Sequence, residues 1–145
     1  MISAVDLVAA WEGFSSRVYY CQAGVLTCGW GSTRDADGKP FTTSATLSPA
    51  QARVLLARDL LAAEATIKLH VKVPLTEGMR TALCSFIYNV GGNAFARSTL
   101  LRLLNRGEPA AVVAAQLARW NLANGKISLG LSRRRAAERA VFLSV

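Results

Sequence analysis

A change of pattern near residue 48 divides this 145-residue chain into a short β-rich part and a long helical part. The segment from Tyr19 to Thr43 is rich in glycine, aromatic, β-branched and turn-forming residues, which predicts a small glycine-rich hairpin region. The motif Ser48-Pro49-Ala50-Gln51 then predicts a helix start, because serine caps, proline fits the first turn and glutamine completes a capping box. This helix should run to about Leu69 and end before Pro74.

Helical patterns fill most of the remaining chain. A first short helix is predicted to end at Gly13, and later helices are predicted at about 77–89 with Thr76 as N-cap, 98–105, 109–119 and 132–143. No repeat or linker interrupts these patterns, so we expect residues 1–145 to form a single domain. The expected fold class is α+β, with a small β-hairpin lobe after the first helix, a larger all-helical lobe and a cleft between them.

Composition limits the classes of protein that the chain can represent. Hydrophobic residues make up 52% of it and charged residues 18%, which supports a packed core and excludes a disordered chain. No apolar stretch approaches the roughly 18 residues of a membrane-spanning helix. The first residues also lack the basic region of a secretory signal. We therefore expect neither a stable membrane anchor nor a signal peptide.

The net charge of +8 is unevenly spread along the chain. Residues 1–45 carry three Lys/Arg and four Asp/Glu, whereas residues 46–145 carry fourteen and five. A basic field of this kind either keeps the protein soluble or favours a polyanionic partner such as nucleic acid, lipid headgroups or a cell-wall polymer. No nucleic-acid-binding motif is present, so we expect no nucleic-acid partner. The spacing of Cys21, Cys28 and Cys84 predicts neither a disulfide framework nor a metal site.

Glu12 is the candidate acid for hydrolytic chemistry. Glycoside hydrolysis needs a protonated carboxyl group beside the leaving oxygen and a second group on the opposite face of the sugar. Glu12 stands at the predicted end of the first helix, between Trp11 and Phe14, and apolar surroundings keep a carboxyl group protonated as a general acid requires. By itself, a glutamate at a helix end is more often a solvated or salt-bridged residue.

The residues that follow Glu12 form a longer pattern. Glu12-Gly13, Tyr19 or Tyr20, Gly24, Thr27, Gly29 and Gly31 stand in the register of Glu-Gly followed by Tyr-x-Asp-x-x-Gly-x-x-Thr-x-Gly-x-Gly. This pattern resembles the signature of the phage lysozymes of glycoside hydrolase family 24. Residues 88–95, 98–101 and 130–138 look like the later blocks of that family, so the resemblance covers nearly the whole chain.

The resemblance implies an endolysin that hydrolyses the β-1,4 bond between N-acetylmuramic acid and N-acetylglucosamine in bacterial peptidoglycan and so lyses the host cell. It implies Glu12, Cys21 and Thr27 as the catalytic set, with no cofactor and no metal. We expect a monomer that is made in the host cytoplasm and acts on the cell wall in the periplasm after release. The alternative is a catalytically silent wall-binding or inhibitory relative.

Cys21 is the departure that motivates this alternative, because the family pattern has aspartate there. A thiol with an ordinary pKa near 8.5 is mostly neutral at pH 7 and does not simply replace a carboxylate. As a thiolate, Cys21 would direct a water molecule or attack the anomeric carbon, and the sequence leaves both roles open. A small buried hydrophobic residue and a disulfide with Cys28 are further interpretations.

Four more residues are predicted to bind substrate. Gly29 and Gly31 would allow close approach of a sugar, although they also suit a purely structural hairpin. Trp30 and Phe95 are candidates for stacking on sugar rings, although such aromatic residues are more often part of the core. The hydroxyl of Thr27 is expected to orient water opposite Glu12, and the resemblance further implies that an arginine among residues 133–135 approaches the catalytic glutamate.

Overall fold

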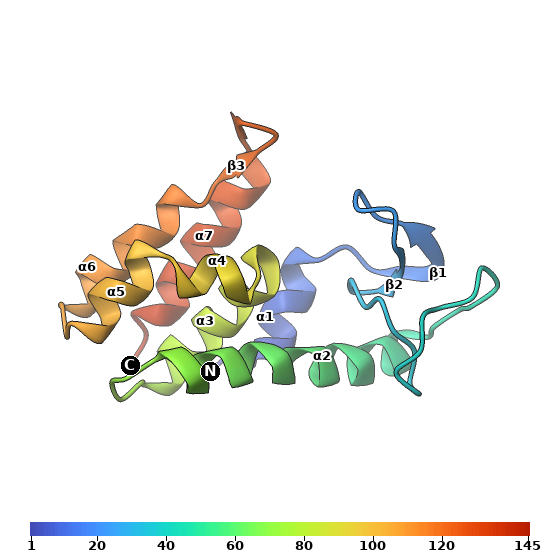
Figure 1. Ribbon diagram of the computed structural model, residues 1–145, viewed down its shortest axis with the longest axis horizontal. Helices are drawn as coiled ribbons and strands as arrows, with labels where there is room; N and C mark the ends of the chain where they lie inside the picture. The colour runs from blue at the N-terminus through green and yellow to red at the C-terminus, as the bar shows by residue number, and fades with distance from the viewer. The chain divides into compact units, whose positions relative to one another are not determined.

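The computed structural model describes all 145 residues and divides them into two compact units. The hairpin unit comprises Val5–Ala62, and the helical unit comprises Met1–Ala4 with Ala63–Val145. The long helix α2 (Pro49–His70) contributes its first part to the hairpin unit and its last part to the helical unit. Figure 1 shows the course of the chain and the element labels. None of the helices is both long enough and apolar enough to cross a membrane.

The hairpin unit is built on α1 (Ala4–Trp11), β1 (Ser15–Tyr20), β2 (Leu26–Gly29) and the start of α2. β1 and β2 pair antiparallel, with an irregularity in β1 between its first residue and Tyr19. Tyr19 lies opposite Thr27. A small apolar cluster of Cys28, Phe41 and Leu55 packs the hairpin onto α2. The predicted glycine-rich hairpin region is therefore confirmed.

The start of α2 follows from the predicted capping box. The backbone amide of Ser48 donates to Oε1 of Gln51 at 2.9 Å, and the amide of Gln51 donates to the hydroxyl of Ser48 at 3.1 Å. Two amides that lack helical partners are satisfied in this way. The helix that follows ends at His70, one residue beyond the predicted end.

Besides the end of α2, the helical unit contains six helical segments and one short hairpin. Helix α3 is central, because most of its residues from Gly78 to Ile87 are buried in the core of this unit. The elements in chain order are α3 (Glu77–Val90), α4 (Gly92–Ala96), α5 (Thr99–Asn105), α6 (Ala110–Ala115), the 3₁₀ turn η1 (Gln116–Arg119), β3 (Leu122–Ala123), β4 (Lys126–Ile127) and α7 (Leu129–Phe142). Helices together with a small antiparallel hairpin confirm the α+β class.

A buried ionic cluster joins α7 to α3. Arg134 and Arg135 are both buried on α7, and Glu138 is fully buried between them. Arg135 forms an ion pair with Glu138 at 2.9 Å, and Nε of Arg134 lies 3.4 Å from Oε2 of the same carboxylate. From α3, the hydroxyl of Ser85 donates to Oε2 at 2.5 Å, and Asn89 accepts a hydrogen bond from Arg135. Of the three consecutive arginines at positions 133–135, two are thus interior residues, and only Arg133 is exposed.

Candidate active site in the hairpin unit

Glu12 lies immediately after α1. Its amide donates to the carbonyl of Val8 at 2.9 Å, so the residue continues the helical turn and its side chain is only partly exposed. Gly13 follows, and the chain then enters β1. The predicted acid is therefore held by a helical backbone at the point where α1 gives way to the hairpin.

Cys21 lies directly after β1, in a tight turn that leads toward β2. Its amide donates to the carbonyl of Val25 at 3.0 Å, and its carbonyl accepts from the amide of Gly24 at 2.8 Å. Gly24 has φ of +75°, a conformation that glycine adopts at little cost. The backbone amide of Val25 lowers the pKa of the Cys21 thiol most, followed by the Thr27 hydroxyl and the amide of Ala23, while burial acts in the opposite direction. The turn thus favours a thiolate at Cys21.

Thr27 is a buried residue of β2, and its hydroxyl points within the hairpin. The hydroxyl donates to the carbonyl of Val25 at 3.0 Å, and it is also a hydrogen-bonding group for the sulfur of Cys21. A hydroxyl carries a single proton, so it cannot donate to the carbonyl and to the sulfur at once. Ionisation of Cys21 should therefore turn this proton toward the sulfur.

Tyr19 connects the three predicted catalytic residues. It lies opposite Thr27 in the strand pairing and is exposed. Burial raises the pKa of the Tyr19 phenol, and the negative charges of Glu12, Cys21 and Cys28 raise it further. The phenol is therefore within electrostatic reach of both Glu12 and Cys21. Sequence reasoning placed Tyr19 in the motif but gave it no role, although Tyr19 and Cys21 share the two-residue spacing of one strand face.

An aromatic pair lies at the surface of the same unit. The rings of Phe14 and Trp30 have centroids 4.9 Å apart with an interplanar angle of 42°. Phe14 and Trp11, which flank Glu12 in sequence, are both exposed, and Trp30 is partly exposed. Exposed rings of this kind suit stacking on a sugar. Trp30 is one of the residues predicted from the sequence to stack on a sugar, whereas its partner Phe14 becomes visible as a candidate only in the structure.

The two hairpin glycines differ from their predicted role in one case. Gly29 has φ of +69°, and an added Cβ would stand 2.9 Å from Cβ of Ala52 on α2. Gly29 is thus buried against a helix, which supports the structural interpretation over approach by a sugar. Gly31, with φ of +95°, is partly exposed and also requires glycine for its backbone conformation.

Phe95 is a correction to the predicted site. Its side chain is fully buried in the core of the helical unit, where its ring packs edge-on against Phe86 at 6.4 Å between centroids. A sugar ring cannot stack on a side chain that exposes no surface. The core interpretation of this residue is therefore the right one, and Phe95 is not part of the candidate site.

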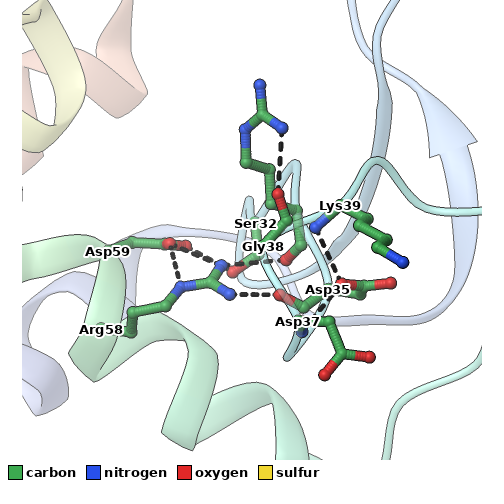
Figure 2. Close-up of polar contacts among 8 residues, drawn as sticks. Ser32, Asp35, Asp37, Gly38, Lys39, Arg58 and Asp59 are labelled. Atoms are coloured by element: carbon green, nitrogen blue, oxygen red, sulfur yellow. Dashed lines mark hydrogen bonds and ion pairs between the residues drawn. The ribbon is translucent and has the colours of Figure 1, made fainter.

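The chain beyond Gly31 is fastened to α2 by polar contacts, which Figure 2 shows. The hydroxyl of Ser32 donates to Oδ2 of Asp59 at 2.6 Å, and Arg58 pairs with Oδ1 of the same carboxylate at 2.8 Å. Arg58 also donates to the backbone carbonyls of Arg34 and Asp35. These contacts fix the segment that follows Trp30, and so they support the position of the aromatic pair.

The three cysteines are free thiols. Cys28 is buried, and its sulfur lies 3.5 Å from the carbonyl of Ser15 and 3.6 Å from that of Ser16, to which the thiol donates. It is thus directed toward β1 and not toward a disulfide with Cys21. No group of three or more His, Cys, Asp or Glu side chains is placed to hold a metal ion.

Comparison with known proteins identifies close relatives of the chain. Residues 9–138 match the family model described as phage lysozyme. The chain is 35% identical over 142 residues to an endolysin of Acyrthosiphon pisum secondary endosymbiont phage 1, covering 95% of this chain and 93% of the relative. It is 40% identical over 132 residues to a SAR-endolysin of Bacteriophage PS119, covering 91% of this chain and 76% of the relative. A crystal structure of a P22 lysozyme mutant superposes with a TM-score of 0.88 at 33% identity, covering 99% of this chain and 100% of that one.

Proposed function

This chain belongs to the phage lysozyme family, and from that premise we propose how its own residues act on the bacterial cell wall. The protein is a glycoside hydrolase, a muramidase of the endolysin type. It hydrolyses the β-1,4 bond between N-acetylmuramic acid and N-acetylglucosamine in peptidoglycan and thereby contributes to lysis of the host cell.

Glu12 is the general acid in this proposal. Its carboxyl proton passes to the glycosidic oxygen as the bond from that oxygen to the anomeric carbon breaks. The support is its position directly after α1, where the backbone hydrogen bond to Val8 holds it, beside the exposed rings of Trp11 and Phe14. These rings and Trp30 form the sugar platform of the proposed site.

Cys21 is the second catalytic group, and it acts as a thiolate. Two reactions suit this position. The thiolate either accepts a proton from the water that attacks the anomeric carbon, or attacks that carbon itself to form a thioglycosidic intermediate that water then hydrolyses. Thr27 is a positioning residue, because its buried hydroxyl stabilises the sulfur and does not face solvent. Intact-protein mass spectrometry after rapid quenching distinguishes the two reactions, since only the second adds a glycan mass to Cys21.

The observation that carries the proposal is the placement of Glu12 on the helical turn that ends α1, where its amide donates to Val8 and the exposed rings of Trp11 and Phe14 flank it in sequence. The test is release of soluble muropeptides from purified peptidoglycan by the wild type and by Glu12→Gln. Because an amide cannot donate the required proton, the variant should lose about 100- to 10,000-fold in rate. Glu108→Gln, at a surface glutamate of the helical unit, is the matched control and should be unchanged. More than a tenth of wild-type activity in Glu12→Gln would show that another residue is the acid.

The distribution of charge supports an anionic wall as the partner. The helical unit carries twelve Lys/Arg and four Asp/Glu, whereas the hairpin unit carries five of each. The whole positive excess therefore lies outside the unit that holds the proposed catalytic residues, and it attracts the polyanionic substrate over a range of about 10 Å. We place the action of the protein at the wall, in the periplasm, after release from the host cytoplasm. We also expect a monomer, which sedimentation velocity can test.

A further inference from the structure

The β3–β4 hairpin of the helical unit is exposed along its whole length. Leu122 lies opposite Ile127, and Ala123 opposite Lys126. The amide of Ser128 closes the base of the hairpin by donating to the carbonyl of Asn121 at 2.8 Å. The two turn residues, Asn124 and Gly125, have φ of +52° and +77°, as a tight two-residue hairpin turn requires. The hairpin is therefore a defined structure, and Figure 1 shows it projecting from the start of α7.

This hairpin and the residue that begins α7 present large aliphatic side chains to solvent. The exposed fractions are 59% for Leu122, 75% for Ile127 and 64% for Leu129. Leu122 and Ile127 share one face of the hairpin, because residues directly opposite in an antiparallel pair point to the same side. Single exposed aliphatic residues are ordinary, but these three gather around the base of the hairpin and form an exposed apolar patch.

The apolar patch lies in a segment whose charged residues are all positive. No aspartate or glutamate occurs between Glu108 and Glu138. Three exposed cations flank the patch: Lys126 in β4, Arg119 at the end of η1, and Arg133 one helical turn after Leu129 on α7. An apolar patch surrounded by cations fits a partner that is apolar inside and anionic at its surface.

The size and chemistry of the apolar patch favour a lipid bilayer over other possible partners. A stable protein interface buries about 800 Å² on each partner, which is more than three side chains supply. Leucine and isoleucine neither hydrogen-bond sugar hydroxyls nor offer an aromatic face, so a glycan strand is a poor match. A bilayer surface requires no shape complementarity, and it takes up small apolar side chains while its phosphates pair with lysine and arginine.

We propose that the β3–β4 hairpin docks this protein on an anionic lipid membrane. Leu122, Ile127 and Leu129 enter the headgroup region, and the three cations contact lipid phosphates. The contact is peripheral and reversible, because three aliphatic side chains are far too few to span a bilayer. None of these residues is among those proposed to hydrolyse the glycan, so the two activities can be tested with separate variants.

The test is co-sedimentation of the full chain with lipid vesicles. The wild type should bind vesicles of phosphatidylglycerol and phosphatidylethanolamine but not vesicles of phosphatidylcholine alone. Leu122→Ser/Ile127→Ser should lower the partition coefficient by about tenfold or more, because several methylene groups no longer enter the lipid. The matched control, Leu69→Ser/Val112→Ser, changes two exposed aliphatic residues elsewhere in the same unit and should bind as the wild type does. Lys126→Gln should weaken binding roughly fivefold at low salt and have no effect at high salt.

The same variants separate this inference from the proposed function. Leu122→Ser/Ile127→Ser should hydrolyse purified peptidoglycan at the wild-type rate, since no lipid is present in that assay. The inference is overturned if the wild type does not bind anionic vesicles. It is also overturned if the hairpin variant binds them as well as the wild type or the control variant does. A third outcome also overturns it: sedimentation velocity shows a wild-type dimer, and the hairpin variant is monomeric but still binds vesicles. The apolar patch would then be a protein interface.

Discussion

Replacing Glu138 with glutamine should destabilise the helical unit far more than any surface charge substitution. The substitution keeps the shape of the side chain and an oxygen that can accept one hydrogen bond, but it removes the negative charge. Two guanidinium groups then remain buried, those of Arg134 and Arg135, at 3.4 Å and 2.9 Å from the former carboxylate. Ser85 also loses a charged acceptor.

The expected loss is about 3–5 kcal/mol, the usual range when one partner of a buried ion pair is removed. Burial raises the pKa of Glu138, against the opposing effects of Arg135, Ser85 and Arg134, so the cluster is costly to bury even when it is complete. Its cost is tolerable only while the charges balance. For a chain of this size, roughly 3–4 °C of midpoint temperature accompanies each kcal/mol, which gives a fall of about 10–20 °C.

Urea denaturation followed by circular dichroism measures the free energy of unfolding directly. The control is Glu108→Gln, which removes an exposed partner 3.9 Å from Arg106 and should cost less than about 1 kcal/mol. If Glu138→Gln cost no more than this control, the balance of buried charge would not be what requires glutamate at position 138.

Three further predictions concern the hairpin unit. Hydrogen bonds lower the pKa of the Cys21 thiol, so its alkylation by iodoacetamide should begin at a lower pH than that of an ordinary cysteine. Burial raises the pKa of Cys84 to about 11, so Cys84 should stay unlabelled in the folded protein at pH 8. Peptide mass spectrometry measures both. Cys21→Asp should keep muropeptide release and Cys21→Ser should lose it; equal rates for Cys21→Ser and the wild type would leave the thiol without a catalytic role. Gly29→Ala should cost about 2–4 kcal/mol in urea denaturation, since a Cβ there meets Ala52, whereas Gly24→Ala, with a similar φ but open space, should cost only about 1–2 kcal/mol.

Helix starts agree best with the prediction where a side chain caps the first turn. Ser48 and Gln51 begin α2, and Thr76 begins α3 by accepting from the amide of Met79 at 3.1 Å. The start of α7 was placed three residues late, at Ser132, because the serine that caps this helix is Ser128. Both serines precede apolar helical patterns, and only the course of the chain after the β3–β4 hairpin distinguishes them.

Other elements gave too short a signal. α4 has five residues, and Gly91 both ends α3 and begins α4, so the sequence shows no separate start for this helix. The strands β3 and β4 have two residues each, which is too few to show any alternation, although Asn124-Gly125 is a strong turn signal. In the candidate site, the resemblance to the phage lysozyme signature selected Glu12, Cys21 and Thr27. The position of Tyr19 opposite Thr27 follows only from the strand register. The burial of Phe95 could not be predicted, because one aromatic residue in a short helix does not show which face of the helix packs into the core.

The surroundings of position 21 decide how well a thiol there ionises. An ordinary thiol is mostly protonated at neutral pH, so the thiolate form of a cysteine is then a minor fraction of the protein. The amides of Val25 and Ala23 and the Thr27 hydroxyl lower the pKa of Cys21 and so enlarge that fraction. The same donors would stabilise a carboxylate at this position, since they recognise negative charge and not sulfur. Cys21→Asp would then place a carboxylate on hydrogen-bond donors that already stabilise negative charge at this position. For this reason the turn that accommodates Cys21 should also accept aspartate. Serine stays neutral, so these donors cannot give it the negative charge that the proposed reaction requires.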